Sequence, residues 1–159
     1  KRQYHQKNMS SIFTTIFPFL KNKNSDIQEE KKRIRNDIHY LKKDISEEAK
    51  LLDEKKVFDK IEKLDVFSKA DTILIYWAIK NELPTQQTIA KWSEYKTILL
   101  PSIEGDKLLL KSYKKEGKMV QKKLGIMEPE LDEYFKGRID LVIVPGVAFD
   151  RNKNRLGRG

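Results

Sequence analysis

The chain has 159 residues, with 33 Lys and Arg against 24 Asp and Glu, which gives a formal net charge of +9. This length fits one domain with a core of its own, and the positive excess favours anionic partners such as nucleotides, nucleic acid, polyglutamate or acidic lipid headgroups. Cysteine is absent and His5 and His39 are the only histidines, which excludes disulfides, thiolate nucleophiles and cysteine-ligated metals and makes a histidine-rich metal site unexpected.

Residues 1–24 are predicted to form a poorly ordered extension in front of a single domain over residues 25–159. Within the extension, a basic stretch precedes an apolar run at 12–20 that Pro18 interrupts. This run is shorter than the about 20 apolar residues that span a bilayer, and the Lys-Asn-Lys-Asn after it does not resemble a signal-peptide cleavage site. We therefore regard Met9 as a candidate natural start and expect a cytoplasmic protein, with targeting or membrane contact as the alternative.

Two helices are predicted before any strand, the first over residues 26–43. Its apolar residues recur at helical spacing: Ile27, Ile34, Ile38, Leu41 and Ile45. Ser25 or Asp26 is placed to cap this helix, and Glu29 stands where a capping box needs an acid. A second helix is predicted to begin after Ser46, which suits an N-cap. Its apolar residues also recur at helical spacing: Leu51, Val57, Phe58, Ile61 and Leu64.

A strand, a helix and a second strand are predicted in the middle of the chain. Residues 72–79, TILIYWAI, form a continuous β-branched and aromatic run that is typical of a strand covered on both faces. Thr85 is placed to cap a short helix that runs through Trp92, and residues 96–102 are predicted to form the next strand. A strand-helix-strand connection of this kind places its two strands parallel in one sheet.

The C-terminal part is predicted to return to the same sheet. A Gly-Asp pair before residues 107–113 indicates a hairpin or edge strand, whereas residues 114–138 are expected to be irregular. Residues 139–146, IDLVIVPG, have the most strand-like pattern of the chain. This strand delivers the C-terminal loop to the carboxyl edge of the sheet, where open α/β folds bind ligands. The predicted class is therefore α/β, with a mostly parallel or mixed sheet and two N-terminal helices.

The terminal loop ends on RLGRG, which suits an anion. Arg155 and Arg158 each present a guanidinium that can grip a phosphate through two parallel hydrogen bonds. Gly157 and Gly159 allow backbone N–H groups to turn toward such an anion. A single Gly-x-Gly is weak support for a phosphate loop, and no Walker sequence occurs. A solvated surface turn is the alternative for an unaided loop of this composition.

A second basic element, KKRIR at residues 31–35, begins the first predicted helix. Lys31 and Arg35 stand four residues apart and therefore on one helix face, so they can contact one polyanion together. A solvated helical face is the alternative. Nucleic acid also suits the charge, but the chain shows no zinc finger, basic zipper or aromatic ribonucleoprotein motif, and we expect no nucleic-acid partner.

The segment YWAIKNELPT at residues 76–85 places one acid, Glu82, after the end of an apolar strand. A carboxylate there is a candidate hydrogen-bond acceptor for a ligand, and Tyr76 or Trp77 is suited to packing on a flat ring. The alternative is that both aromatic residues belong to the core. His39 has no evident partner and is predicted to be a surface or boundary residue.

These segments together resemble the 5-formyltetrahydrofolate cyclo-ligases, also called methenyltetrahydrofolate synthetases. The resemblance rests on KKRIR, YWAIKNELPT, LPSI, LGIMEP at 124–129 and DLVIVPGVAFDRNKNRLGRG, in that order, and covers residues 26–159. It implies a three-layer α/β sandwich related to the sugar-phosphate isomerase and CoA-transferase group. It also implies the use of ATP and Mg²⁺ to convert 5-formyltetrahydrofolate to 5,10-methenyltetrahydrofolate.

The resemblance also implies a set of site residues. The ATP-binding set is Lys31, Lys32, Arg33, Ile34, Arg35, Arg155, Leu156, Gly157, Arg158 and Gly159. The substrate-binding set is Tyr76, Trp77, Glu82, Arg35 and Arg158, and the catalytic set is Arg158, Glu82 and Arg35. Family members continue with Gly-Tyr-Tyr-Asp, whose aspartate helps to hold Mg²⁺, so we expect that ligand beyond Gly159 and a domain lacking its C-terminal part.

Two other functions remain open at this stage. A sugar-phosphate isomerase or CoA-transferase-like enzyme shares the implied fold but needs no ATP. A non-enzymatic nucleotide or RNA binder explains the basic charge but not the pairing of KKRIR with RLGRG and Glu82. The partner expected from the resemblance is 5-formyltetrahydrofolate, with or without a polyglutamate tail, bound by a monomer that has no membrane partner.

Overall fold

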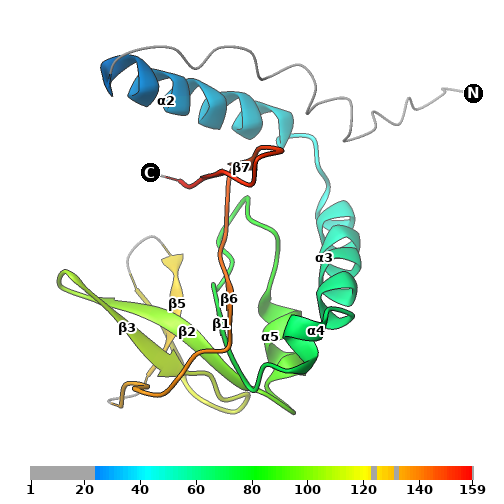
Figure 1. Ribbon diagram of the computed structural model, residues 1–159, viewed down its shortest axis with the longest axis vertical. Coiled ribbons are helices and arrows are strands. Elements are labelled where there is room, and N and C mark those ends of the chain that lie inside the picture. Colours follow the sequence, from blue (N-terminus) through cyan, green and yellow to red (C-terminus); the bar gives the residue numbers. More distant parts are fainter. Residues whose placement is uncertain (1–23, 123–124, 131–132, 159) are drawn as a thin grey trace, which may run out of the picture.

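The computed structural model describes residues 24–122, 125–130 and 133–158. The predictions for residues 1–23, for Leu124 of the LGIMEP motif and for Gly159 lie outside the described residues. A four-stranded sheet forms the centre, and the long helix α2 lies apart from it beside the C-terminal end of the chain (Figure 1). This arrangement brings the two basic segments of the sequence to the same end of the molecule.

Helix α2 spans Asn24–Leu41 rather than residues 26–43. Ser25 and Asp26 therefore lie inside its first turn rather than before it, and the capping role expected of one of them stays a prediction. An acid in the first turn still suits the helix dipole. Ile34 is 7% exposed whereas Leu41 is 43% exposed, so the predicted apolar stripe is buried near its middle but not at its end.

Helix α3 spans Glu47–Glu62 and begins as the sequence predicts, because the Ser46 Oγ accepts a hydrogen bond from the Ala49 N–H at 3.2 Å. The residues that it buries are Glu54 and Phe58. Ile61 of the predicted stripe is partly buried against the core, whereas three other members are exposed: Leu51 by 44%, Val57 by 40% and Leu64 by 51%. The helical period was therefore correct, but the face that it buries is narrower than the stripe.

A third helix, α4 at Asp65–Ser68, precedes the first strand, so the prediction of two helices before any strand missed one. It is a single turn, too short for a periodic pattern to reveal. Its Phe67 is 4% exposed and packs against Trp92 with ring centroids 4.7 Å apart. The short helix thus adds an aromatic ring to the core.

The predicted strand-helix-strand unit is present. Strand β1 spans Thr72–Ile75, helix α5 spans Gln86–Trp92, and strand β2 spans Thr97–Glu104. The two strands are parallel, with Thr72 opposite Thr97. However, β1 ends at Ile75 and not at residue 79, so the aromatic and apolar residues that follow it leave the sheet.

Strand β3 at Lys107–Ser112 pairs antiparallel with β2, as the hairpin prediction requires. Gly105, with φ of +59°, forms the turn between them in the left-handed region that favours glycine. Residues 114–138, expected to be irregular, contain a short antiparallel ribbon of β4 (Met119–Gln121) and β5 (Met127–Pro129). Strands of three residues carry too little pattern for sequence to show them.

A buried polar pair fixes this ribbon to the sheet. Glu128 of β5 is 4% exposed and Ser102 of β2 is fully buried. The Ser102 hydroxyl donates to the Glu128 Oε2 at 2.5 Å, and the Ile103 N–H faces the Oε1 of the same carboxylate at 3.4 Å. Because a buried carboxylate is costly unless hydrogen-bonded, the pair specifies how β5 packs on β2.

Strand β6 spans Leu141–Ile143 and pairs parallel with β1. It is shorter than the predicted 139–146. Just before it, the Asp140 carboxylate accepts hydrogen bonds from the Asp71 and Thr72 N–H groups at 3.1 and 3.0 Å. These bonds lower the pKa of Asp140, and the bond from Thr72 has the larger effect. They also connect the start of β6 to the start of β1.

The C-terminal segment, predicted as a loop, forms a hairpin. Strand β7 (Ala148–Phe149) pairs antiparallel with β8 (Arg155–Leu156). In the turn between these strands, the Asp150 carboxylate accepts hydrogen bonds from both the backbone N–H and the side-chain amide of Asn154, each at 2.8 Å. These bonds lower the pKa of Asp150. The basic terminus is therefore held in a defined conformation up to Gly157.

The sheet order is β3-β2-β1-β6, which confirms a mixed sheet. Helices α3, α4 and α5 lie on one side of this sheet (Figure 1). The core between helices and sheet is built around the fully buried Trp92, whose ring meets the Phe58 ring edge-on at 5.4 Å. Its indole N–H donates to the Glu62 carboxylate at 2.7 Å, so the ring is both packed and hydrogen-bonded.

The opposite face of the sheet is only partly covered in the described residues. Val142 of β6 is 49% exposed, whereas Leu99 of β2 is fully buried. None of the described helices covers this face, so the second helical layer of the expected three-layer sandwich stays a prediction. Within the same residues no helix is both long and apolar enough to cross a membrane.

Candidate functional site

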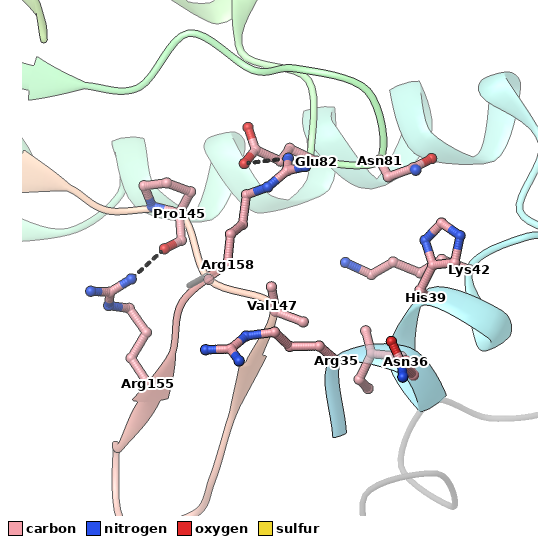
Figure 2. Close-up of a pocket in the computed structure, with 12 residues that line it drawn as sticks. Arg35, Asn36, His39, Lys42, Asn81, Glu82, Pro145, Val147, Arg155 and Arg158 are labelled. Atoms are coloured by element: carbon pink, nitrogen blue, oxygen red, sulfur yellow. Dashed lines mark hydrogen bonds and ion pairs between the residues drawn. The ribbon is translucent and has the colours of Figure 1, made fainter. Parts of the chain in front are cut away.

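A cleft with a volume of about 410 Å³ opens at the carboxyl edge of the sheet. Because β1 and β6 are parallel, the segments that follow them meet at this edge. Helix α2 and the hairpin β7–β8 close the cleft (Figure 2). The side chains that line it from α2 and the following turn are Arg35, Asn36, Ile38, His39 and Lys42. Those from the other segments are Asn81, Glu82, Pro145, Gly146, Val147, Arg155 and Arg158.

The two basic segments of the sequence meet across this cleft. The Arg35 Nε donates a hydrogen bond to the Gly157 carbonyl at 2.9 Å, which joins residues 122 positions apart in the chain. A second arginine, Arg155, donates to the Pro145 carbonyl at 2.9 Å. Each of these bonds uses only part of a guanidinium, so donors remain for an anion. The geometry confirms that KKRIR and RLGRG lie side by side.

Gly146 allows the hairpin to fold against the segment that precedes it. A Cβ at this position would overlap the tip of the Phe149 ring. The aromatic ring of β7 therefore covers the backbone at the cleft wall, and a larger residue at position 146 would require this ring to shift. The glycine of DLVIVPGVAFD is thus explained by packing within the wall.

Glu82 is the single carboxylate among the described side chains that line the cleft. Its Oε2 accepts a hydrogen bond from the Ile79 N–H at 3.1 Å, and its Oε1 lies 3.4 Å from the Arg158 guanidinium. The Glu82 side chain is 16% exposed whereas that of Arg158 is 56% exposed. The acid is therefore fixed in the wall, while the arginine is held by one long, solvent-accessible contact.

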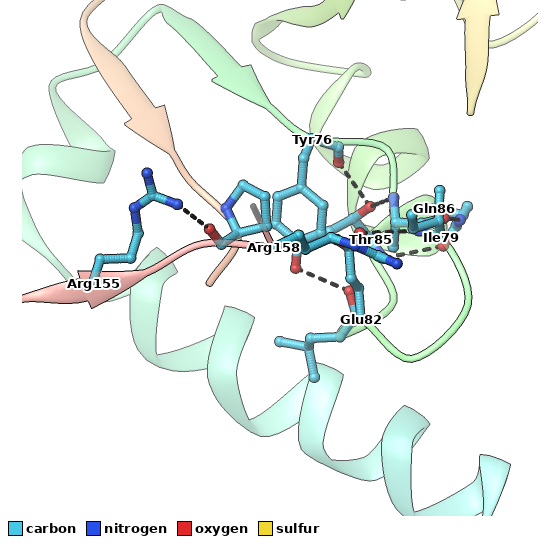
Figure 3. A network of polar contacts seen from close by, with 10 residues as sticks. Tyr76, Ile79, Glu82, Thr85, Gln86, Arg155 and Arg158 are labelled. Atoms are coloured by element: carbon cyan, nitrogen blue, oxygen red, sulfur yellow. Dashed lines mark hydrogen bonds and ion pairs between the residues drawn. The ribbon is translucent and has the colours of Figure 1, made fainter. Parts of the chain in front are cut away.

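A turn after β1 positions Glu82. Asn81 has a φ of 71°, a left-handed conformation that asparagine tolerates better than most residues, and the Glu82 N–H bonds to the Ile79 carbonyl at 3.1 Å. Below the turn, Thr85 is fully buried; it accepts from the Ala78 N–H at 3.0 Å and donates to the Tyr76 carbonyl at 2.9 Å (Figure 3).

Thr85 was predicted to cap α5, and that role was wrong. It occupies the N-cap position, but its side chain makes no capping hydrogen bond. The hydroxyl instead binds the backbone after β1, and the Gln86 amide donates to the Ala78 carbonyl at 2.8 Å (Figure 3). These side chains replace a neighbouring strand as partners of that backbone, which explains why β1 ends early.

The two aromatic residues expected at the folate pocket do not line the cleft. The Tyr76 hydroxyl donates to the Leu83 carbonyl at 2.9 Å, and its ring is packed against the core. Burial, with smaller contributions from the nearby acids, raises the pKa of Tyr76 above its ordinary value, so its hydroxyl stays protonated. Trp77 packs with Tyr113, their ring centroids 6.2 Å apart.

The residues of KKRIR have different surroundings. Arg35 alone of the five lines the cleft. Ile34 is buried, and Arg33 is engaged on the helix surface by Glu30 at 2.5 Å and Asp37 at 3.3 Å. Lys31 and Lys32 lie on the turn of α2 before Arg35, and Lys31 shares its face four residues earlier. The binding roles proposed for these residues stay predictions.

Sequence reasoning missed four polar side chains of the cleft: Asn36, His39, Lys42 and Asn81. His39 was expected at the surface and it is exposed, yet it also lines the cleft. A signal for Lys42 was present, because positions 35, 38, 39 and 42 follow one helix face. However, the face of α2 that meets the hairpin is determined by tertiary packing, and it cannot be predicted from the helix pattern alone.

The cleft is strongly cationic. Arg35, Arg155, Arg158 and Lys42 face a single acid across it. Burial lowers the pKa of the Lys42 ammonium; Glu82 opposes this effect, and Arg158 and Lys50 add to it. An anion entering the cleft would therefore relieve repulsion among these groups.

A metal site is not supported by the described residues. Nowhere among them do three His, Asp or Glu side chains gather in a way that could hold an ion. Mg²⁺ prefers carboxylate and phosphate oxygens, and here Glu82 is already bonded to Ile79 and Arg158. What the cleft offers is a set of guanidiniums for phosphate oxygens beside one hydrogen-bond acceptor.

Comparisons with known proteins agree with this geometry. The sequence profile of the 5-formyltetrahydrofolate cyclo-ligase family matches residues 27–159. The chain is 34% identical over 97 residues to the 5-formyltetrahydrofolate cyclo-ligase of Escherichia coli (strain K12), covering 57% of this chain and 53% of that protein. It is 32% identical over 98 residues to the enzyme of that name from Haemophilus influenzae, covering 57% of this chain and 52% of that protein.

A solved structure is similar as well. The NMR structure of Aquifex aeolicus 5,10-methenyltetrahydrofolate synthetase superposes with a TM-score of 0.74 at 29% identity, covering 81% of this chain and 67% of that one. The chain spans about half the length of the curated relatives that it matches.

Proposed function

The chain belongs to the 5-formyltetrahydrofolate cyclo-ligase family, and we propose that it converts 5-formyltetrahydrofolate to 5,10-methenyltetrahydrofolate, with ATP consumed and ADP and phosphate released. The relatives named above carry this activity in their names. The chain's own support for the proposal is a cationic cleft with one fixed carboxylate.

One observation carries the proposal: the Arg35 to Gly157 hydrogen bond at 2.9 Å, which joins the two basic segments on either side of the cleft. Arg35 extends from α2, Arg155 bonds to the Pro145 carbonyl on the hairpin side, and Arg158 extends toward Glu82 (Figure 2). Guanidiniums supplied by two elements match the several oxygens of a triphosphate better than those of a single phosphate.

The reaction needs an activated formyl oxygen. N10 of the folate attacks the formyl carbon on N5, but an amide-like oxygen is a poor leaving group. Transfer of the γ-phosphoryl group of ATP to that oxygen lets it leave as phosphate, while N10 loses its proton and the N5–C–N10 bridge forms. Such a transfer depends on positioning and charge neutralisation more than on a covalent side chain.

In this scheme Arg158 and Arg35 neutralise charge on the transferred phosphoryl group, and Arg155 contacts the remaining phosphates. Glu82 accepts a hydrogen bond from the folate beside N10 and fixes the orientation of the attacking nitrogen. The support for its role is that the carboxylate is held by the Ile79 N–H and lines the cleft (Figure 2). Backbone N–H groups around Gly157 are available to the same phosphates.

Arg158 is proposed to leave Glu82 for the phosphoryl group as that group is transferred. Its contact with Glu82 is 3.4 Å long and its side chain is 56% exposed, so the pair contributes at most about 1 kcal/mol. A charge-assisted donor on the transition state is worth about 3 to 4 kcal/mol. The exchange is therefore favourable, and it frees Glu82 to contact the folate.

Other features of the proposal rest on the family alone. Mg²⁺ is proposed to accompany ATP, but no step is assigned to it, because the described residues supply no site for it. The three-layer fold related to the sugar-phosphate isomerase and CoA-transferase group is proposed likewise, as is a cytoplasmic location. A monomer is proposed likewise.

The competing functions are less well supported. An isomerase or CoA-transferase acts on a substrate that carries no triphosphate, whereas the cleft is lined by three arginines beside a single acid. A nucleic-acid binder would present its charge on an open surface, whereas here it lines a concave site.

The test is production of 5,10-methenyltetrahydrofolate, followed by its absorbance, from 5-formyltetrahydrofolate and the complete product of the gene. The proposal predicts formation that requires ATP and releases one ADP for each product. Turnover without ATP would favour the isomerase or transferase class. Tight ATP or RNA binding with no product, from a folded protein, would favour a binding function.

A further inference from the structure

Lys42 is a cleft residue that the reaction scheme leaves unused. It follows the last residue of α2, and its N–H bonds to the Ile38 carbonyl at 3.1 Å, so it continues the final turn of the helix. Its side chain is half-buried and extends into the cleft (Figure 2). In that view Lys42 and Arg155 lie at opposite ends, with Arg158 between them. The ammonium is therefore separate from the outermost guanidinium.

Within the described part of the chain, the Lys42 ammonium forms no hydrogen bond or ion pair with a carboxylate. Glu82 is the acid that acts on it electrostatically, but Glu82 already contacts Arg158 and the Ile79 N–H. A partly desolvated ammonium without a partner is unfavourable. The adjacent Lys50 carries the same charge and cannot serve as one.

We propose that Lys42 binds a carboxylate of the glutamate tail of the folate substrate. This inference rests on the proposed function, which supplies the folate. The folate carries its negative charge only at the glutamate, whereas its pteridine end is neutral. With N10 held beside Glu82, the glutamate extends away from the reacting atoms and can reach the side of the cleft from which Lys42 extends (Figure 2).

The alternative anion is a phosphate of the nucleotide. Three guanidiniums already suit the triphosphate, and their planar, bidentate donors match phosphate oxygens. A single ammonium is a point charge on a flexible stem, which suits a carboxylate whose position varies. Carboxylate and phosphate are both anions, however, so the test must separate the two sources.

The test measures the binding of three ligands to the complete gene product: 5-formyltetrahydrofolate, its analogue that lacks the glutamate (5-formyltetrahydropteroate), and ATP. Lys42→Met is expected to weaken the binding of 5-formyltetrahydrofolate by about tenfold, which corresponds to the loss of one charge-assisted hydrogen bond. The same variant is expected to leave the affinities for the glutamate-free analogue and for ATP unchanged. Lys42→Arg is expected to recover most of the loss.

Lys43→Met is the matched control. Lys43 is exposed, and its ammonium lies 5.5 Å from the centre of the Tyr40 ring, outside the cleft lining. This variant removes the same charge one residue away and is expected to bind all three ligands as the wild type does. Equal losses in Lys42→Met and Lys43→Met would show a general charge effect and overturn the inference.

Two further results would overturn the inference about Lys42 but not the proposed function. An equal loss for 5-formyltetrahydrofolate and for the glutamate-free analogue would show that Lys42 does not contact the glutamate. A loss confined to ATP would assign Lys42 to the nucleotide. In both cases a wild-type protein that still forms product keeps the proposed function intact, whereas a wild-type protein that binds no 5-formyltetrahydrofolate overturns both.

Discussion

Replacing Arg158 by alanine tests the proposed chemistry at a residue whose side chain is only weakly held in the structure. Within the described residues the guanidinium makes one ion pair, at 3.4 Å to Glu82, and its side chain is 56% exposed. Because exposed ion pairs contribute about 0 to 1 kcal/mol, Arg158→Ala should barely change the free energy of unfolding. Any large effect of the substitution must therefore arise in the reaction.

The expected kinetic effect is much larger than the structural one. Loss of a preorganised donor at a developing charge costs about 3 to 4 kcal/mol, or about 100- to 1,000-fold in kcat. The loss should appear in kcat, with a smaller change in KM for 5-formyltetrahydrofolate, because the contact is made chiefly in the transition state. The assay is the ATP-dependent growth of methenyltetrahydrofolate absorbance.

Arg151→Ala provides the matched control. Arg151 is exposed in the turn of the same hairpin and does not line the cleft, so its removal changes the net charge equally without touching the site. Full turnover by Arg158→Ala, or equal losses in the two variants, would refute the role given to Arg158. A large drop in the unfolding midpoint of Arg158→Ala would contradict the structural part of the reasoning.

Three further predictions concern the frame around the cleft. Gly146→Ala should lower stability by about 1 to 3 kcal/mol and weaken ATP binding, because the new methyl group overlaps the Phe149 ring; an unchanged urea midpoint would contradict it. Glu128→Ala should cost about 1 to 3 kcal/mol by leaving the buried Ser102 hydroxyl without its acceptor, and Glu128→Gln less; equal midpoints for the two variants would count against this. Asp140 has a pKa lowered by two backbone N–H groups at the start of β1, so its stabilising effect is complete above the ordinary aspartate pKa of about 4 and disappears as the pH falls through the lowered value. Asp140→Asn should flatten that part of the stability curve, and an identical acid unfolding profile would contradict it.

The central sheet could be predicted from sequence because its signals are local and strong. The continuous apolar run that begins at Thr72, the helix ending at Trp92 and the turn at Gly105 each appear where expected. The end of β1 could not be predicted. It depends on the buried Thr85 hydroxyl binding a backbone that lies nine residues earlier, and side-chain partners of that kind leave no periodic trace.

The helices illustrate a second limit. The spacing of apolar residues in α3 is helical, yet Leu51 is 44% exposed while Glu54 is 3% exposed. A carboxylate is buried there because the Thr88 hydroxyl of α5 donates to it at 3.1 Å, and no pattern within α3 announces that partner. Burial of a polar residue is decided by what another element brings to it.

The site was predictable to the extent that the family resemblance extends. Arg35, Glu82 and Arg158 were expected together, and the structure places all three at one cleft. Lys42 was not expected, because its position depends on the rotation of α2 relative to the hairpin. Trp77 was expected at the pocket, but the early end of β1 turns it toward Tyr113.

The most direct test of the central claim follows the formyl oxygen. The complete gene product is given ATP and 5-formyltetrahydrofolate that carries ¹⁸O in its formyl group, and the released phosphate is analysed by mass spectrometry. If the phosphoryl group is transferred to the formyl oxygen in this cleft, each phosphate released should contain one ¹⁸O, and Arg158→Ala should slow its appearance in step with product formation. Phosphate free of ¹⁸O, formed at the same rate as methenyltetrahydrofolate, would contradict the account.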